Sequence, residues 1–482
     1  MQTFPPGPSL PSAVQGYRYN ADPMGFIEEC AARYGDCFTL RFPLQPAAVY
    51  VKSPEVVKQI FAGSTDDLRM GEAAAPIDFL LGSNSLIRLD GARHTRDRKL
   101  LMPSFHGERM VAYAEMMRVI AERAVDGWEL GKPFSFLKAA QNITLSIMLE
   151  CIFGVGPGEL HDRLRALLPK FLHESSKPMI SLLWATVPGK LLRDVLVRGL
   201  APAAHALGPA GSVVPAGTWA RSLREIDEFL YSHIAAQRAR RSPEASDIIS
   251  MLIEVRDEQG NAFSDAELRD EMMTMLVAGY ETTAITLTWA MAKILEYPHV
   301  LAAIREELDR VIGDRPPSGA AIGELRYLDA TIKEVLRLYP PSPGTARKLH
   351  VPGRFGGYDL PAGVVLYPSI YLLHRRPDIW PDPLRFDPSR FLDKKPNPAA
   401  YIPFGGGLRT CLGMSFALFE LKLVLATILS RASLRAVEAP PLRYVPRGIL
   451  LPFGPSHDVP VALEAREPKR PRRSAQASVL SN

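Results

Sequence analysis

The chain has 482 residues, of which 47% are hydrophobic and 23% are charged. This composition is typical of a globular protein and excludes a disordered chain, a fibre and a small disulfide-rich scaffold. The 57 basic and 52 acidic residues give a net charge of +5, and residues 464–482 alone hold five bases and two acids, hence +3 of it. The remaining body is nearly neutral, which argues against a nucleic-acid partner.

The cysteines and the N-terminus indicate a reducing compartment. There are only four cysteines and no CxxC pair, so neither a disulfide framework nor a zinc site is expected. Three prolines precede residue 10 and no apolar block follows a basic stretch, which excludes a signal peptide and a membrane anchor there. We therefore expect a cytoplasmic monomer with one domain over residues 1–463 and a basic, disordered tail over residues 464–482.

The predicted elements make the fold mainly α with a minor β part. Short strands are expected at residues 37–42 and 48–51, and helical periodicity dominates the middle of the chain. The longest helix begins at the capping box of Ser264 and Glu267 and meets no proline before residue 298. Gly279 at its centre costs about 1 kcal/mol relative to alanine. Either another group approaches the backbone closely there, or the helix is distorted.

Two further helices are expected. The first, over residues 324–339, carries Glu334 and Arg337 on its polar face and stops at a Pro-Pro pair. The second begins near Met414 and is apolar almost all round, as in a buried helix. Cys411 lies just before it, where a helix N-terminus favours the thiolate. A single thiolate can hold haem iron, whereas zinc needs three or four protein ligands.

The segment FGGGLRTCLG resembles the haem-binding signature F-x-x-G-x-R-x-C-x-G of the cytochrome P450 superfamily. The matching residues are Phe404, Gly407, Arg409, Cys411 and Gly413. The resemblance implies that Cys411 is the iron ligand of haem b (iron protoporphyrin IX), with Phe404 and Gly413 beside the cofactor. It covers residues 5–463 and implies a soluble, bacterial type of the cytochrome P450 fold, a single haem-binding domain with a long central helix over the haem.

A second motif lies in that long helix, where AGYET is similar to the family pattern A-G-x-[DE]-T. The resemblance implies an oxygen-binding groove opened at Gly279, with Glu281 and Thr282 as catalytic residues. An acid beside a hydroxyl can relay protons during oxygen activation. Without the resemblance, a threonine inside a helix is read as a side chain that bonds to its own backbone.

A third motif joins distant segments. Glu334 and Arg337 form an ordinary i, i+3 pair when taken alone. Together with Arg390 in FDPSRF, they resemble the family triad that braces the loop behind the haem, a structural role.

The residues expected to bind the haem propionates come from three segments. Residues 91–105 are similar to the family's early helix, although many members have Trp where His94 stands. The resemblance implies that His94, Arg98, Arg347 and Arg409 donate to the propionates.

The residues that the resemblance places around the substrate are apolar apart from Thr345, which predicts a hydrophobic substrate such as a fatty acid, terpenoid, steroid-like compound or polyketide. They are Phe79, Leu80, Leu81, Leu86, Ile87, Leu276, Val277, Ala278, Gly279, Thr345, Ile449, Leu450 and Leu451. Arg69 and Arg88 flank the first cluster and are either solvated or free to meet a substrate carboxylate. The Gly- and Pro-rich run at 199–217 is predicted to be a mobile lid.

The predicted function is a haem-dependent monooxygenase that uses O₂ and two external electrons to hydroxylate or epoxidise its substrate. No flavin or iron–sulfur segment is visible, so a ferredoxin or flavodoxin with an NAD(P)H-dependent reductase is implied. Arg93, Arg96, Arg98 and Lys99 would attract an acidic donor to the cysteine side of the haem. Three alternatives stay open, namely a peroxygenase, an isomerase or dehydratase of the same fold, and a haem-binding gas sensor or electron carrier.

Overall fold

The structure is a computed structural model that describes residues 4–105, 107–175, 199, 217–240, 247–393, 395–447 and 452–467. Almost all of the predicted lid (199–217), the pocket candidates Ile449, Leu450 and Leu451, and the tail beyond residue 467 lie outside these residues. Among the described helices, none has the length and apolar character needed to cross a membrane. The cytoplasmic location and the monomeric state stay predictions.

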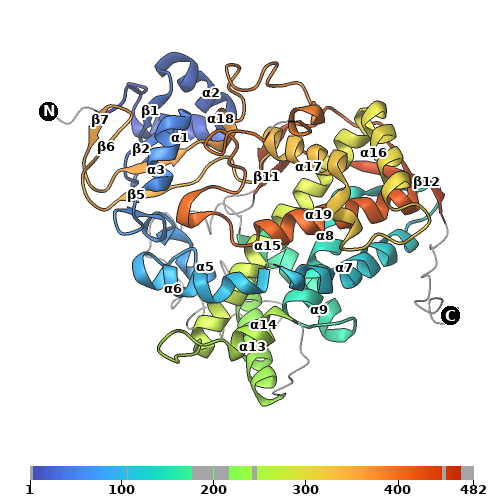
Figure 1. The fold of residues 1–482 in the computed structure, drawn as a ribbon. Coiled ribbons are helices and arrows are strands. Elements are labelled where there is room, and N and C mark those ends of the chain that lie inside the picture. The colour runs from blue at the N-terminus through green and yellow to red at the C-terminus, as the bar shows by residue number, and fades with distance from the viewer. Residues whose placement is uncertain are drawn as a thin grey trace, which may run out of the picture.

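Helices dominate the described part of the chain (Figure 1). They are α1 (Ser12–Ala21), α2 (Pro23–Tyr34), α3 (Pro54–Ala62), α4 (Met70–Ala73), α5 (Asp78–Leu81), α6 (Gly91–Leu101), α7 (Glu108–Asp126), α8 (Phe136–Ile147), α9 (Glu159–Ser175), α13 (Gly217–Arg240), α14 (Ile248–Glu254), α15 (Asp265–Glu296), α16 (Pro298–Val311), α17 (Arg326–Leu338), α18 (Ile370–Leu373) and α19 (Met414–Arg431). In Figure 1, α15 and α19 run through the middle of the molecule, with the other long helices around them.

The strands form small sheets at the margins of this helical body (Figure 1). They are β1 (Cys37–Leu40), β2 (Ala48–Val51), β3 (Leu68–Arg69), β4 (Pro133–Ser135), β5 (Arg347–Leu349), β6 (Gly353–Phe355), β7 (Tyr358–Leu360), β8 (Val365–Pro368), β9 (Ala432–Ala436), β10 (Tyr444–Pro446), β11 (Phe453–Pro455) and β12 (Pro460–Arg466). The largest sheet has the order β1-β2-β8-β5-β3, in which only β2 and β8 are parallel. The predicted class, mainly α with a minor β part, is confirmed.

The second sheet corrects the predicted end of the domain. Its order is β4-β12-β9, and the pairing of β12 with β9 continues to Arg466 opposite Ala432. The boundary predicted after residue 463 therefore falls inside strand β12. The prediction rested on the basic character of the residues that follow, and charge alone does not show where a paired strand ends.

The long helix α15 forms as its sequence predicts. The Ser264 hydroxyl accepts the Glu267 N–H at 3.3 Å, and the Glu267 carboxylate accepts the Ser264 N–H at 2.8 Å, which completes the capping box. The helix then continues for 32 residues. Most of its side chains are buried between neighbours on every side, so α15 is the core around which the other helices pack.

Gly279 is explained by a close approach and not by a distortion of α15. The helix is continuous through this position. A Cβ on Gly279 would lie 2.7 Å from Sδ and Cε of Met148, which belongs to the π-helical turn η3 (Met148–Ile152). The missing side chain at Gly279 makes room for the end of Met148, and the groove expected from the resemblance stays a prediction.

Helix α17 begins two residues later than predicted. Glu307 of α16 accepts the N–H groups of Tyr327 and Leu328 at 2.7 and 2.9 Å. This carboxylate satisfies donors of the first turn that have no partner within the helix, and thereby fixes where the helix starts. Glu324 instead ends a separate 3-10 turn.

The loop before α19 is shaped by glycines that lie against α3. Gly407 has a φ of +67°, and a Cβ there would lie 2.2 Å from the backbone oxygen of Phe61. A Cβ on Gly406 would meet the Phe61 ring at the same distance. The loop closes through the Cys411 N–H, which donates to the Phe404 oxygen at 2.9 Å. Glycine at 406 and 407 is therefore needed to bring Cys411 to the start of α19.

We predict that Gly407→Ala destabilises the folded protein by about 1–3 kcal/mol, because the left-handed backbone and the contact with Phe61 are both incompatible with a Cβ. Urea unfolding followed by circular dichroism measures the loss. Gly323→Ala is the matched control, since Gly323 is not in the left-handed region and has open space at its Cβ. Equal unfolding midpoints for the two variants would contradict the packing argument.

Candidate active site

Cys411 lies at the start of α19 and its side chain is accessible. Protein atoms nevertheless surround it in most directions, and this burial raises the pKa of its thiol. The backbone N–H of Gly413, which bonds to the sulfur, and the charge of Arg98 act in the opposite direction and stabilise the thiolate. An accessible sulfur with an amide donor and a nearby cation is an environment in which a cysteine can bind a metal.

Four potential cations converge beside this cysteine. Burial lowers the pKa of Arg347 and of Arg409 to about 10. Burial also lowers the pKa of His94 to about 3, and the charges of Arg409, Arg98 and Arg347 lower it further. Asp90 forms an ion pair with Arg409. The structure thus brings together all four residues that the sequence assigned to the propionates.

This cluster has more donors than acceptors. Among the described residues, His94 Nδ1 and Arg409 Nε are buried without a partner, and Arg98 makes no hydrogen bond or ion pair. Three arginines face one carboxylate, a combination that is costly to bury without further negative charge. The two propionates of a haem supply that charge, and Cys411 supplies the thiolate ligand. The residues present therefore fit a haem group.

Glu281 and Thr282 are not brought together. Glu281 is buried against α8, where Gln141 Nε2 donates to its two carboxylate oxygens at 3.1 and 3.0 Å. Burial raises the pKa of Glu281, while Gln141, the charge of Arg447 and Tyr280 oppose the rise. Consecutive helical residues point about 100° apart, so Thr282 lies on a different face. Its hydroxyl donates to the Ala278 oxygen at 2.8 Å, which is the backbone bond that the sequence left as the alternative.

The stretch of α15 around Thr282 has an accessible side. Ala278 is exposed, and Val277, Gly279 and Thr282 are half-buried, whereas the preceding Leu276 is 2% exposed. This is unusual on a helix whose side chains are mostly buried. The open side of α15 therefore coincides with part of the predicted pocket.

Four other pocket candidates are buried in the core, and their place around the substrate stays a prediction. Phe79, Leu80 and Leu81 are only 0–2% exposed, as is Leu276, and all four belong to the main hydrophobic core. Phe79 packs on Trp219 with ring centroids 5.3 Å apart. A short apolar run reads the same whether it lines a cavity or fills a core.

The remaining candidates on this side are less enclosed. Leu86 is 8% exposed, while Ile87 and Thr345 are half-buried. The two flanking arginines have protein partners, since Arg69 pairs with Glu72 at 2.7 Å and Arg88 with Asp78 at 3.3 Å.

The predicted triad is present in the core. Glu334 and Arg337 are fully buried and joined by two hydrogen bonds of 2.7 Å, and Arg390 Nε lies 3.5 Å from the Glu334 carboxylate. Burial raises the pKa of Glu334, and the two arginines oppose the rise. Arg337 also donates to the backbone oxygens of His374, Pro383 and Arg385 at 2.7–3.2 Å. The triad therefore holds the chain that leads toward the cysteine loop.

His374 was missed by the sequence reading and connects this triad to the cysteine loop. Its Nε2 accepts the Ile402 N–H at 2.9 Å, so Nδ1 carries the proton and donates to the Arg337 oxygen at 3.2 Å. Burial, with the charge of Arg337, lowers the pKa of His374 to about 3 and keeps the ring neutral. A single histidine after an apolar run gives no sequence signal for this role.

The cations expected to attract an electron donor are largely neutralised. Arg96 pairs with Asp97 and Asp257 at 2.7 Å, Lys99 pairs with Glu258, and Arg93 pairs with Glu267 at 3.0 Å. Arg98 points toward the cysteine cluster. Three of the four cations of the predicted basic surface on α6 are therefore paired with acids, and the docking of a donor there stays a prediction.

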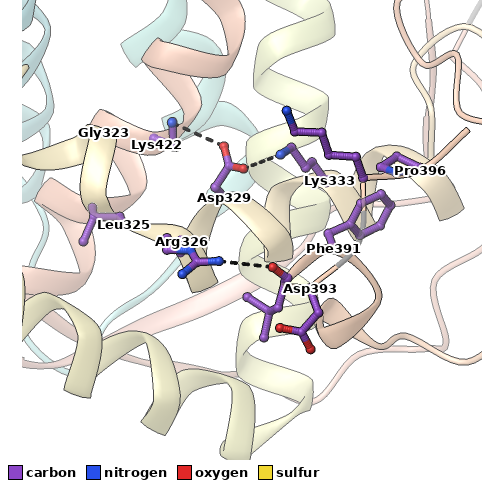
Figure 2. Close-up of a pocket in the computed structure, with 11 residues that line it drawn as sticks. Gly323, Leu325, Arg326, Asp329, Lys333, Phe391, Asp393, Pro396 and Lys422 are labelled. Atoms are coloured by element: carbon purple, nitrogen blue, oxygen red, sulfur yellow. Dashed lines mark hydrogen bonds and ion pairs between the residues drawn. The ribbon is translucent and has the colours of Figure 1, made fainter. Parts of the chain in front are cut away.

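Figure 2 shows a surface cleft of about 390 Å³ between α17, α19 and the segment after Phe391. Asp329 at its centre pairs with Lys333 at 2.6 Å and with Lys422 at 3.3 Å. Arg326 and Lys395 add two more cations and Asp393 a second acid. This cleft contains no residue of the Cys411 cluster and is a separate, cationic feature of the surface.

The pKa of His374 leads to a prediction about stability. A neutral histidine that titrates near 3 when folded and near 6.5 when unfolded contributes stability that is complete above pH 6.5 and is lost as the pH falls toward 3, by about 1.4 kcal/mol per pH unit. His374→Gln retains one donor and one acceptor but does not titrate. We expect its free energy of unfolding to fall less steeply between pH 6.5 and 4 than that of the unaltered protein, in urea titrations at each pH. The exposed His299→Gln should keep the original slope, and a slope shared by all three proteins would refute the prediction.

Comparison with known proteins places the chain in a family. A family model described as Cytochrome P450 matches residues 2–194 and 216–455. A Mycobacterium tuberculosis protein with the provisional name cytochrome P450 135B1 is 33% identical over 453 residues, covering 92% of this chain and 89% of its own length. Another from the same species, provisionally cytochrome P450 138, is 32% identical over 448 residues and covers 92% and 93%.

Solved structures share the fold. A retinoic acid-bound cyanobacterial CYP120A1 superposes with a TM-score of 0.79 at 21% identity, over 97% of this chain and 100% of that one. The haem domain of cytochrome P450DA gives 0.80 at 22% identity, over 97% and 99%. With the matched family model and these relatives, the chain belongs to the cytochrome P450 family and is a haem-thiolate monooxygenase.

Proposed function

We propose that this enzyme hydroxylates or epoxidises a hydrophobic small molecule, and that its cofactor is haem b held by Cys411. The observation that carries the proposal is the accessible Cys411 thiol beside a cluster of three arginines that has Asp90 as its one paired carboxylate. We also propose that the two electrons come from a ferredoxin or flavodoxin with an NAD(P)H-dependent reductase. The surface that the donor contacts is not assigned to α6, where Arg93, Arg96 and Lys99 are paired with acids.

The residues around the cofactor divide into two groups. Cys411 would ligate the iron, with the Gly413 N–H tuning the sulfur and Phe404 packing nearby. Arg98, Arg347, Arg409 and neutral His94 would bind the propionates. When bound, haem activates O₂, so that one oxygen atom enters the substrate and the other leaves as water.

The proposed proton relay uses residues of α15. The Thr282 hydroxyl lies on the accessible side of the helix and can exchange its bond to the Ala278 oxygen for one to a group in the site. Glu281 must leave Gln141 to contact that side, because its carboxylate faces α8. The raised pKa of Glu281 lets it hold a proton at a higher pH than an exposed carboxyl would. The two residues would thus deliver protons in sequence.

The side chains beside this face support an apolar substrate. Leu86, Ile87, Val277 and Ala278 offer hydrocarbon surface, and Thr345 offers one hydroxyl. The cyanobacterial neighbour, whose structure contains retinoic acid, is an example of this fold with an apolar ligand. Fatty acids, terpenoids, steroid-like compounds and polyketides are the classes to test.

The deciding experiment is the absorbance difference spectrum of the reduced protein with carbon monoxide, followed by titration with a panel of those compounds. We expect the long-wavelength Soret band of thiolate-ligated haem, and a shift of the ferric Soret band with at least one compound as distal water is displaced. Cys411→Ser should lose the thiolate band, while the buried Cys151→Ser should keep it. A thiolate band that survives in Cys411→Ser, or no response to any compound, would favour a different ligand or the sensor function.

The relay is tested with Thr282→Ala and Glu281→Gln. We expect both variants to keep the haem spectrum and to divert electrons from product to peroxide, because general acid catalysis contributes about 10²–10⁴-fold to a proton-transfer step. The measurement is product formed per NAD(P)H consumed. Thr283→Val is the matched control, since the Thr283 hydroxyl is buried and bonds to the Gly279 oxygen at 2.9 Å. Unchanged coupling in Thr282→Ala would remove the assignment.

A further inference from the structure

The segment 81–89 is tied to α15 by three consecutive charged side chains. Arg269 Nη1 donates to the Leu81 oxygen at 3.2 Å, Asp270 accepts the Asn84 N–H at 3.0 Å, and Glu271 accepts the Leu86 N–H at 2.7 Å. We call residues 81–89 the strap. The three charged residues are 0%, 6% and 2% exposed, so these bonds lie inside the protein.

Further contacts in the same region reinforce the strap. The Thr274 hydroxyl, one turn along α15, donates to the Ser85 hydroxyl at 2.6 Å, and both residues are buried. The close packing extends to the backbone, since a Cβ on Gly82 would lie 2.1 Å from the Asp270 carboxylate. Only glycine, here at a φ of +91°, lets the chain pass so near to that group.

The other side of the strap is held by the propionate cluster. Arg409 donates to the Leu86 oxygen at 3.2 Å and to the Leu89 oxygen. Leu86 therefore has its N–H bound to Glu271 of α15 and its C=O bound to Arg409 of the cysteine loop. One residue therefore joins the central helix, 185 residues along the chain, to an arginine of the proposed haem site, 323 residues along the chain.

Helix packing does not require charged residues at these positions. An apolar side chain would fill the same space without desolvating a carboxyl group. Nor do the acids bind cations of the proposed haem site, because Glu271 accepts the Leu86 N–H and Asp270 bonds to Asn84 and to the neighbouring Arg269. What Glu271 and its neighbours do is fix the path of the strap, which contains Leu86 and Ile87, two of the residues that the resemblance places around the substrate.

We propose that Glu271 is a positioning residue that sets the shape of the substrate pocket and the placement of Arg409 by holding the Leu86 peptide. The part of this inference that concerns substrate rests on the proposed function, whereas the part that concerns the strap does not. Glu271 itself contacts neither substrate nor cofactor in this scheme.

The protonation of Glu271 determines which substitutions test the inference. Burial raises its pKa well above the ordinary value, with Asp97 and Asp270 adding to the rise and the Leu86 N–H and Arg93 opposing it. A protonated carboxyl group still accepts the Leu86 N–H through its carbonyl oxygen. Glutamine offers the same oxygen at the same distance, so Glu271→Gln should preserve the strap, while Glu271→Leu should release it.

The test is hydrogen exchange of the full-length, haem-loaded protein and of the same protein after haem extraction, resolved to the strap. We expect amide exchange over residues 81–89 to be about tenfold faster in Glu271→Leu than in the unaltered protein, and nearly unchanged in Glu271→Gln. Glu271→Asp, which withdraws the oxygen by one methylene but alters the fold less, should be intermediate. It keeps the test decisive if Glu271→Leu does not fold.

Glu307→Leu is the matched control, because Glu307 is also a buried carboxyl that accepts backbone N–H groups, at the start of α17. It should speed exchange around Tyr327 and leave the strap unchanged. Equal exchange of the strap in Glu271→Leu and the unaltered protein, or the same acceleration in Glu307→Leu, would overturn the inference.

Ligand titration provides the second readout. With saturated fatty acids of increasing length as probes, Glu271→Leu should shift the chain length that gives the largest Soret response and weaken the best binder about tenfold, while Glu271→Gln should not. An unchanged length preference in a variant with a released strap would overturn the pocket part of the inference. If no probe binds the unaltered protein, the proposed substrate class fails, and the exchange result still decides whether Glu271 holds the strap.

Discussion

The site depends on a concentration of positive charge beside a single thiol. Arg409 lies within electrostatic reach of Arg98 and Arg347, Arg98 lies within reach of Cys411, and Asp90 is the nearby acid. Such a group is costly to assemble in a protein interior, and its cost falls when an anion binds. The uncompensated positive charge therefore favours the binding of a dianionic cofactor. Burial and the same positive charge lower the pKa of His94, which stays neutral among these arginines.

The central helix α15 supports the site at two places along its length. Its middle presents Ala278 and Thr282 on an accessible side, and its beginning presents charged side chains to the strap. The helix can carry buried charged groups because each of Arg269, Asp270, Glu271 and Glu281 finds a hydrogen-bonding or ion-pair partner, which offsets the loss of water. Helix α15 therefore shapes the apolar side of the site. Through its bond to the Leu86 peptide it also supports Arg409, which binds the same peptide.

Local patterns in the sequence were sufficient for some of these features. The capping box of Ser264, the glycines before Cys411 and the Glu334–Arg337 pair depend on spacings of a few residues, and the structure contains each of them. The cation cluster followed from family positions, since three separate segments supply it.

Features that depend on partners distant in sequence were not predictable in this way. Arg96 and Lys99 read as a basic surface until Asp257 and Glu258 fold against them. The sequence around Phe79 fits a pocket residue and a core residue equally well, and in the structure Phe79 packs on Trp219 in the core. Glu281 sits next to Thr282 in sequence, yet the helical rotation turns it toward Gln141. In each case the local sequence allows two environments, and a tertiary contact selects one.

The two loops that flank the site are held in the same manner, and this has a consequence for specificity. His374 and Arg337 bind backbone groups on the way to Cys411, while Glu271 and Arg409 bind the backbone of Leu86. Bonds to peptide groups do not depend on which side chain the residue carries. Substitutions of Leu86 or Ile87 by other apolar residues can therefore change the pocket surface while the peptide stays in place. Because the strap is held through its backbone, its peptide groups support the cofactor site, and its side chains remain free to determine the choice of substrate.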